Sequence, residues 1–576
     1  MYDHLEVEKK WQKYWADHET FKTDVWDFSK PKFYALDMFP YPSGVGLHAG
    51  HPEGYTATDI VSRMKRMQGY NVLHPMGYDS FGLPAEQYAV QTGNNPNGFT
   101  QTNIKTFTKQ LQELGFDYDW SKMIATSDPE FYHWTQWIFK QLYKDGYAKY
   151  VDMPVNWCEE LGTVLSNDEV IDGKSERGGY PVVRKNMKQL CIDQAAFAER
   201  LLEGLNEIDW PESTKEMQRN WIGRSTGVEV QFEIVGGGKF SIFTTCIETI
   251  YGITFMVLAP DGDLVQELMP RIKNQDEVKA YIQETVSKSE MDRTELNKGK
   301  TGCRLEGIKA INPVNGKEVE VFIGDFVLAN YGTGAVMAVP SHDQRDFEYA
   351  IAHNIDRIQV IEGQDVSEHA FEKQDYLGKG CKLINSEEFT GLTVEEAKVA
   401  ITKKLVDMGI AKETVNYRFR EWIFARQRYW GEPVPIVHLE DGTDYVLPDE
   451  ELPLILPELE DYKGHNGKAP LENATEWKQY NQNGVKGVRE TSTMPGSAGS
   501  SWYYLRYIDP HNDKQLADPE LLKHWMPVDL YVGGPEHAVG HLMYSRIWNN
   551  YLYDKGIVAC KEPFKKLVHQ GMILGE

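Results

Sequence analysis

The sequence has few of the features that mark a membrane protein, a secreted protein or a metal-stapled protein. No stretch approaches the roughly 18 apolar residues that a membrane-spanning helix needs. The first residues, MYDHLEVEKKWQKYW, contain no apolar signal core. The six cysteines lie far apart and form no CxxC pair, which argues against a disulfide framework or a zinc ribbon. These absences predict a cytoplasmic protein with reduced thiols and no membrane partner.

Positive charge is also scarce. Asp and Glu number 86 against 61 Lys and Arg, so the formal net charge is −25. Because a phosphate-binding surface needs local positive charge, composition alone argues against a nucleic-acid partner. Net charge is a sum over the whole chain, however. Basic clusters at 63–69 (RMKRMQG) and 418–430 (RFREWIFARQRYW) could still line a groove.

Length and hydrophobic periodicity predict several domains of the α/β class. The 576 residues are enough for about three or four domains. Residues 33–39 (FYALDMF) and 70–76 (YNVLHPM) have the pattern of strands, and Gly69 can end a helix between them. The apolar face of that helix holds Ile60, Val61, Met64 and Met67. A strand, a helix and a strand in this order predict a Rossmann-type, doubly wound parallel sheet.

A β-rich residue pattern interrupts this α/β pattern. From about Val228, short β-rich runs are separated by Gly and Pro, which predicts a compact mixed α/β or β-barrel-like insertion ending near residue 415. The α/β pattern then resumes with a predicted strand at 528–534 (VDLYVGG). The helix expected after it carries apolar residues at Val539, Leu542, Met543 and Ile547.

The loop after the first predicted strand has the position of a phosphate site, because it leaves a parallel strand and leads into a helix. His48 and His51 at the helix start could donate to phosphate oxygens as charge shifts during transfer. Gly44, Gly46 and Ala49 also satisfy a loose dinucleotide fingerprint. From the residues alone, an NAD-dependent enzyme and a pair of ordinary loop histidines stay open as alternatives.

Longer runs carry a family resemblance. FPYPSGVGLHAGHPEGYTATD (39–59) resembles the HIGH-type signature of class I aminoacyl-tRNA synthetases in its leucyl form, and 69–89 (GYNVLHPMGYDSFGLPAEQYA) and 220–225 (NWIGRS) resemble the same family. The resemblance implies ATP- and Mg²⁺-dependent activation of L-leucine, transfer to tRNA(Leu) and hydrolysis of mischarged tRNA. A valyl or isoleucyl enzyme is the alternative within the class, disfavoured by FPYPSG. A non-catalytic RNA-binding or amino-acid-binding remnant is the alternative outside it.

The resemblance also implies site residues in both halves of the catalytic domain. His48 and His51 would be catalytic, and Asp79 would hold the substrate ammonium through a charge-assisted hydrogen bond. The ATP site would comprise His48, Gly50, His51, Gly533, Gly534 and Glu536. The leucine site would comprise Met38, Phe39, Tyr41, Asp79, Ser500, Tyr503, Tyr531, His537 and His541.

His537 and His541 have a second interpretation, because they stand four residues apart on one predicted helical face, a spacing that could bind zinc. The metalloprotease pattern needs Glu directly after the first histidine, and this chain has Ala538 there. No metal ligands are therefore predicted.

A second site would serve proofreading, because a hydrophobic pocket separates side chains that differ by one methylene by only about 1–3 kcal/mol. FTTCIETIYG (243–252) and GTGAVMAVPSHDQRDFEYA (332–350) resemble the family's editing site. Asp346 would bind the ammonium of the mischarged residue and Thr249 would exclude leucine by its size. The rest of the pocket would be Thr244, Thr245, Val339, His342 and Asp343. Water would attack the ester directly; a Cys246 thiolate with His342 as base is the alternative.

The chain departs from the family pattern in three places. Cys246-Ile247-Glu248 replaces the family's Arg-Pro-Asp, which removes an arginine contact with the terminal adenosine of the tRNA. Cys158 stands alone where relatives pair cysteines, so no structural zinc is expected. The sequence stops at HQGMILGE, before the family's KMSKS loop, so it resembles a truncated chain, a split subunit or an incomplete gene product. A carboxyl-terminal fragment or subunit is then a further expected partner, and we expect weak or no full aminoacylation without it.

Four segments are predicted from these patterns. They are a first half of the catalytic domain at 1–150, a zinc-less connective insertion at 151–225, a β-rich editing domain at 226–415, and a second half of the catalytic domain at 416–576. Arg426 and Arg428 lie at the return to the catalytic domain, where they would meet the acceptor end of the tRNA or remain surface charges.

Overall fold

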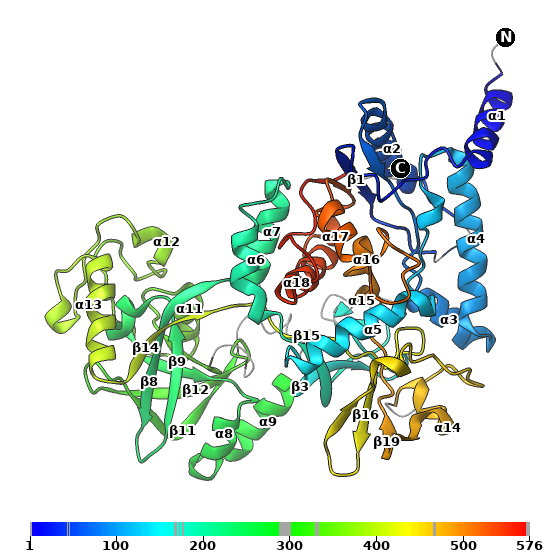
Figure 1. Ribbon diagram of the computed structural model, residues 1–576. Helices are drawn as coiled ribbons and strands as arrows, with labels where there is room; N and C mark the ends of the chain where they lie inside the picture. The colour runs from blue at the N-terminus through cyan, green and yellow to red at the C-terminus, as the bar shows by residue number, and fades with distance from the viewer. Residues whose placement is uncertain are drawn as a thin grey trace. The chain divides into compact units, whose positions relative to one another are not determined.

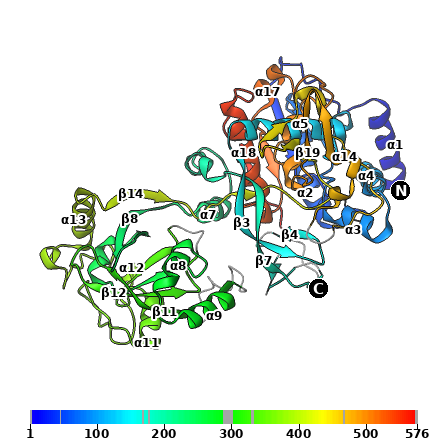
Figure 2. The same cartoon turned by 90° about the horizontal axis from the view of Figure 1, so that it is seen from below.

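In the computed structural model the chain forms two compact units (Figures 1 and 2). Unit 1 comprises Met1–Leu165, Lys185–Ile222 and Phe419–Glu576, and unit 2 comprises Ser166–Arg184 and Gly223–Arg418. The structure describes residues 3–42, 44, 46–165, 170–171, 173–175, 178–286, 301–328, 333–464 and 468–571. Among these residues, no helix combines the length and the apolar character needed to cross a membrane.

A four-stranded parallel sheet lies at the centre of unit 1, as predicted. Its order is β2 (Asn71–Leu73), β1 (Lys32–Asp37), β20 (Leu530–Val532) and β21 (Leu567–Val568). Leu36 pairs with Tyr531, so the two distant halves of the sequence form one sheet. Because parallel strands end at the same edge, the residues after β1 and β20 are brought together.

The helix between β1 and β2 is confirmed as α2 (Gly50–Met67), and Gly69 follows it with φ +88°. The apolar residues that predicted it do not pack into the core. Ile60, Met64 and Met67 are 62%, 45% and 88% exposed. The buried face instead carries Gly54, Tyr55, Thr58 and Ser62. Thr58 and Ser62 donate to buried carboxylates, at 2.5 Å to Asp37 and 2.7 Å to Asp117, which explains why polar residues are buried there.

The helix after β20 begins later than its sequence pattern predicted. His537 ends a short 3-10 turn, η9 (Pro535–His537), and α18 (His541–Asp554) starts only after an intervening turn. His537 and His541 therefore do not share one helical face. Leu542, Met543 and Ile547 are buried in α18 as expected, whereas Val539 precedes it.

Unit 1 is completed by further helices and two further sheets. The sheets are β15 (Trp422–Ile423), β7 (Val183–Ile192), β3 (Ala148–Cys158), β4 (Thr163–Leu165), and β17 (Asp444–Val446), β16 (Ile436–Leu439), β19 (Val485–Arg489), β18 (Gln479–Gln482). The helices are α1 (His4–Asp17), α3 (Leu83–Thr92), α4 (Pro96–Leu114), α5 (Pro129–Lys144), α6 (Ala198–Gly204), α7 (Glu212–Ile222), α14 (Thr475–Lys478), α15 (Ser497–Ser500), α16 (Tyr503–Arg506) and α17 (Pro519–Trp525).

Unit 2 contains one seven-stranded mixed sheet with its own core. The sheet order is β13 (Ala335–Ala338), β10 (Phe255–Leu258), β12 (Glu318–Gly324), β11 (Gly302–Ile311), β8 (Ser225–Ile234), β14 (Ala411–Asn416), with β9 (Lys239–Thr244) also on β8. Its helices are α8 (Asp263–Leu268), α9 (Gln275–Val286), α11 (Gln344–Ala352), α12 (Lys373–Tyr376) and α13 (Val394–Asp407). Helix α13 packs beside β14 (Figure 1). The predicted change to β-rich texture corresponds to this sheet.

The predicted zinc-less insertion is divided between the two units. Cys158 is buried at the end of β3. Residues 166–169, 172, 176 and 177 of the same segment lie outside the described residues, so its ligand content stays a prediction.

Candidate functional site

An aromatic wall lies at the edge where β1 and β20 end. The ring of Phe39 stacks on Tyr503 with centroids 3.9 Å apart and planes 6° apart. The Tyr503 hydroxyl lies 2.7 Å from the Tyr531 hydroxyl, which lies 2.6 Å from Nε2 of His541. Burial, and then the charge of His537, lowers the pKa of His541 to about 3, so this imidazole is neutral at physiological pH. The wall is therefore an apolar surface with a neutral polar end.

Asp79 lies close enough to this wall for its charge to act on Tyr531. Asp79 follows β2, and its backbone N–H donates to the Pro40 carbonyl at 3.1 Å. The Thr126 hydroxyl donates to its carboxylate at 3.2 Å, and the Ser500 hydroxyl also donates to it. Burial nevertheless raises the pKa of Asp79 to about 7, because it outweighs these two hydrogen bonds. A cationic ligand at this carboxylate would restore its full charge.

The two loop histidines lie together at the start of α2. Their ring centroids are 3.8 Å apart. Nδ1 of His51 accepts from the His48 N–H at 3.2 Å, and Nδ1 of His48 accepts from the Gly50 N–H at 3.1 Å. Each neutral ring therefore carries its proton on Nε2, which is left as a donor. Burial, and then His48, lowers the pKa of His51 to about 4.

The two glycines after β20 permit close approach of the backbone. A side chain at Gly533 would collide with the thioether of Met38, and one at Gly534 would collide with the carboxylate of Glu536. The Met38 N–H donates to the Val532 carbonyl at 3.0 Å, which joins the ends of β1 and β20. The remaining predicted residue, Tyr41, lies against Gly82.

Two residues near this edge, His569 and Glu432, were not predicted. His569 follows β21, with Nδ1 2.7 Å from the Gly533 carbonyl and Nε2 2.6 Å from the Thr214 hydroxyl. Its place after a parallel strand is a signal that could have found it. Glu432 is fully buried, and burial, and then the charge of Asp79, raises its pKa well above the usual value. Nothing in its sequence context predicts that position.

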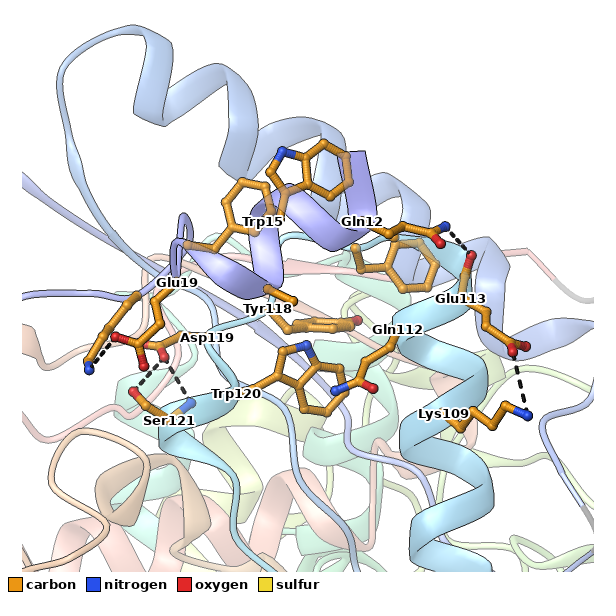
Figure 3. A pocket seen from close by; sticks show the side chains of 15 residues that line it. Gln12, Trp15, Glu19, Lys109, Gln112, Glu113, Tyr118, Asp119, Trp120 and Ser121 are labelled. Atoms are coloured by element: carbon orange, nitrogen blue, oxygen red, sulfur yellow. Dashed lines mark hydrogen bonds and ion pairs between the residues drawn. The ribbon is translucent and has the colours of Figure 1, made fainter. Parts of the chain in front are cut away.

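A cavity of about 480 Å³ lies elsewhere in unit 1, beside α1 and the end of α4, and Figure 3 shows its aromatic and charged lining. None of the predicted site residues lines it. Tyr118 connects it to the sheet, because its hydroxyl donates to the Asp37 carboxylate at 2.8 Å. The Asp37 carboxylate also accepts from the Thr58 hydroxyl of α2 at 2.5 Å.

The predicted editing residues gather at one end of the sheet in unit 2. The Cys246 N–H donates to the Thr244 hydroxyl at 3.0 Å, and the Thr249 hydroxyl donates to the Cys246 carbonyl at 2.8 Å. β9, which leads into this turn, lies beside β13, which leads to Val339. A side chain at Gly252 would crowd Val339 at 3.0 Å, so the two segments are in contact.

Asp346 is the buried acid of this second site. It accepts from the Val339 N–H at 2.9 Å, and its own N–H donates to Asp343, the N-cap of α11, at 3.0 Å. The Arg345 guanidinium lies 3.2 Å from its other oxygen. Burial, and then the charge of Asp343, raises the pKa of Asp346 to about 7 despite Arg345.

His342 is fixed by the backbone. Its Nε2 accepts from the Val360 N–H at 3.0 Å, so Nδ1 carries the proton and donates to the Phe371 carbonyl at 3.0 Å. Burial lowers its pKa to about 4. Both ring nitrogens are occupied, which argues against His342 as a base for the Cys246 thiol.

The remaining sequence interpretations concern metals and arginines. Among the described residues, no group of three or more His, Cys, Asp and Glu side chains is arranged to hold a metal ion. Arg426 donates to the Ile423 carbonyl at 2.6 Å, and the charge of Arg428 acts on the buried Glu86. These two arginines therefore contact their own fold and are not isolated surface charges.

Comparisons with known proteins cover both units. Residues 219–406 match the family model described as leucyl-tRNA synthetase, editing domain, and residues 37–174 match the model for class I tRNA synthetases (M). A solved leucyl-tRNA synthetase, AgnB2 of Agrobacterium radiobacter K84, in a ternary complex with tRNA and LeuAMS, is 34% identical with a TM-score of 0.86. The alignment covers 99% of this chain and 68% of that one.

Proposed function

The chain belongs to the leucyl-tRNA synthetase family of class I aminoacyl-tRNA synthetases, and we propose that unit 1 forms leucyl-adenylate while unit 2 hydrolyses mischarged tRNA(Leu). The chain is a leucine–tRNA ligase, and ATP is its energy source. The observation that carries the assignment of residues is the meeting of Asp79, the aromatic wall and the His48–His51 pair at one edge of the parallel sheet.

Leucine binds with its α-ammonium at Asp79 and its side chain against the wall of Phe39, Tyr503 and Tyr531. The ammonium restores the charge of a carboxyl group that burial otherwise keeps partly protonated. Neutral His541 closes the wall without placing a charge beside an aliphatic side chain. Met38, Tyr41, Ser500 and His537 complete this pocket in the proposal.

ATP binds with its phosphates at the start of α2. The Nε2–H groups of His48 and His51 donate to phosphate oxygens, and these bonds strengthen as negative charge moves to the departing pyrophosphate. Gly533 and Gly534 lie against the adenosine, with Glu536 and Gly50 beside it. Mg²⁺ enters with ATP, bound chiefly by the phosphate oxygens.

Unit 2 holds the ester of a mischarged tRNA between the Thr244–Thr249 turn and Asp346. Asp346 takes the α-ammonium, and Thr249 excludes leucine by its size, so smaller or differently branched residues are hydrolysed. Water attacks the ester with Thr244, Thr245, Val339 and Asp343 around it. His342 contributes by fixing the local backbone through its two ring nitrogens.

tRNA(Leu) is the acceptor, and the reaction takes place in the cytoplasm, in keeping with six free cysteines in the chain. Leucine-dependent ATP–pyrophosphate exchange by the chain tests the proposed formation of leucyl-adenylate.

Calorimetric titration with non-hydrolysable adenylate analogues of leucine, isoleucine and valine tests the proposed leucine site. We expect the leucyl analogue to bind at least tenfold more tightly than the other two, because the valyl side chain lacks one methylene in the apolar pocket and the isoleucyl side chain is branched at a different carbon. Equal affinity for all three analogues would contradict the assignment of the wall. As the internal control, replacing adenosine with inosine in each analogue should weaken the binding of all three by a similar factor.

A further inference from the structure

Two lysine side chains from different helices approach one residue of the editing turn. Nζ of Lys398, in α13, donates to the Thr245 carbonyl at 3.0 Å. Nζ of Lys373, the first residue of α12, donates to the Thr245 hydroxyl at 3.5 Å. Both side chains are half-buried. Two positive charges therefore converge where β9 ends.

These two charges share one buried counter-charge. Within the described part of the chain, neither Lys373 nor Lys398 forms a direct ion pair, but the charges of both act on Glu248, where they oppose the burial that raises its pKa. Glu248 lies in the same turn, is fully buried and accepts a hydrogen bond from the Tyr376 hydroxyl at 3.1 Å, so two lysine charges face one acid. In a chain with a net charge of −25, such a pair is a local exception.

The chemistry of the pair fits an oxyanion with several acceptor oxygens. Each lysine ammonium has three donors, and the contact with Thr245 uses one of them. Lysine is a common ligand of nucleic-acid phosphates, to which it contributes position and charge. The same turn carries Thr244 and Thr249, so a phosphate held at Thr245 would lie close to the bound ester.

We propose that Lys373 and Lys398 form a phosphate clamp, which holds a backbone phosphate of the single-stranded 3′ end of the tRNA beside the editing turn. The inference rests on the proposed function of unit 2 and deepens it. The clamp supplies positive charge from α12 and α13 at a turn where Cys246-Ile247-Glu248 contains no arginine. It binds nucleotide backbone and is independent of the amino acid carried by the ester.

Hydrolysis of isoleucyl-tRNA(Leu) by the full chain tests the clamp. Lys373→Met and Lys398→Met should each raise KM for the mischarged tRNA about fivefold, with kcat within about twofold, because binding and not chemistry is lost. Each should also lower the slope of log KM against log salt by about 0.7. Lys373→Arg and Lys398→Arg should restore both. Lys403→Met is the matched control, since Lys403 lies on the same α13 but pairs with Asp407 at 3.2 Å.

Binding of a labelled RNA oligonucleotide ending in CCA, followed by fluorescence anisotropy, separates the clamp from hydrolysis. We expect the double variant Lys373→Met/Lys398→Met to weaken binding at least tenfold and Lys403→Met to leave it unchanged. Unchanged binding in the double variant would overturn the clamp even if the wild-type chain hydrolyses isoleucyl-tRNA. If the wild-type chain does not hydrolyse it but the double variant still loses binding, the proposed function of unit 2 fails and the clamp stands. Circular dichroism confirms that each variant is folded.

Discussion

At the scale of single residues, the surroundings of an acid decide what it can bind. Asp79 and Asp346 are both carboxyl groups whose pKa burial raises to about 7, and each lies in a different unit. Each would gain charge when an ammonium group arrives, because the ammonium favours the ionised form. A buried carboxyl group with a raised pKa therefore suits recognition of an α-amino group in both proposed sites.

Asp79 predicts a pH dependence of leucine binding. Because only the ionised carboxylate attracts the ammonium, the Kd of a leucyl-adenylate analogue should approach a tenfold rise per pH unit below pH 6 and change by only about twofold from pH 7 to 8.5. Asp79→Asn should raise Kd about 30-fold at pH 8, near the 2 kcal/mol typical of a hydrogen bond to a charged group. Isothermal titration across pH measures both. A variant that kept the wild-type pH profile would place the titrating group elsewhere.

Substitution of Cys246, in contrast to that of Asp79, is expected to have little effect. With both nitrogens of His342 bonded to backbone groups, no base is positioned to activate the thiol. Cys246→Ala should therefore hydrolyse mischarged tRNA within about threefold of the wild-type rate, since its N–H bond to Thr244 is kept. Single-turnover deacylation measures this. A loss of a hundredfold or more would favour a thiol nucleophile.

The identities of these residues could be predicted from sequence, but their partners could not. Asp79 and Asp346 lie in motifs, whereas Thr126 and Glu432 reach the site only through tertiary packing. The backbone bonds of His342 depend on Val360 and Phe371, which lie 18 and 29 residues away. No local pattern encodes such contacts.

At the scale of elements, α2 illustrates how a correct helix prediction can mislead about its buried face. Periodicity found the helix, but Ile60, Met64 and Met67 face outward. The buried side is polar because β1, β2 and the segment after α4 supply a set of charged partners there. His74 lies at its centre, 2.6 Å from Asp117 and 3.1 Å from Asp37.

His74 predicts a loss of stability at alkaline pH. Burial alone would lower its pKa, but Asp117 and Asp37 outweigh burial and raise it to about 9. Since this folded value exceeds the unfolded value of 6.5, the stabilisation is fully present below about pH 6.5 and is lost as pH rises through 9. His74→Asn, which removes the cation between Asp37 and Asp117 and leaves Arg66 as the remaining cation beside Asp117, should lower the free energy of unfolding by about 3 kcal/mol at pH 7.

Urea unfolding at pH 7 and pH 9.5 measures this difference. The variant should be much less sensitive to this pH change than the wild type, because its side chain does not titrate. His133→Asn is a suitable control, because burial lowers the pKa of His133, so this side chain is not held charged between two carboxylates. Equal pH sensitivity of the wild type and His74→Asn would show that another group is responsible.

At the scale of the whole molecule, a β-rich domain interrupts the sequence of the parallel-sheet domain. The change in residue pattern along the chain predicted this interruption, but it did not predict the order of the strands. The alternation near Val228 and its end near residue 415 are visible in composition. The pairing of β1 with β20, across nearly 500 residues, is not, because strand order depends on long-range contacts. The sequence did predict a further strand at 528–534, but it did not predict which strands would be its neighbours.

The ends of the central segment of unit 2 predict that this segment can be removed. Ser225 of β8 pairs with Asn416 of β14 in antiparallel register, so the chain enters and leaves the segment within about 5 Å. The segment has its own apolar core, which includes Val230, Ile323 and Ile401. Replacing residues 226–415 with a four-residue Gly/Ser linker should therefore keep the affinity for a leucyl-adenylate analogue within about threefold, because no binding residue is removed. Hydrolysis of isoleucyl-tRNA(Leu) should be abolished. If analogue binding and hydrolysis were lost together while circular dichroism reported a folded protein, the two sites would depend on each other, and the assignment of one task to each unit would be wrong.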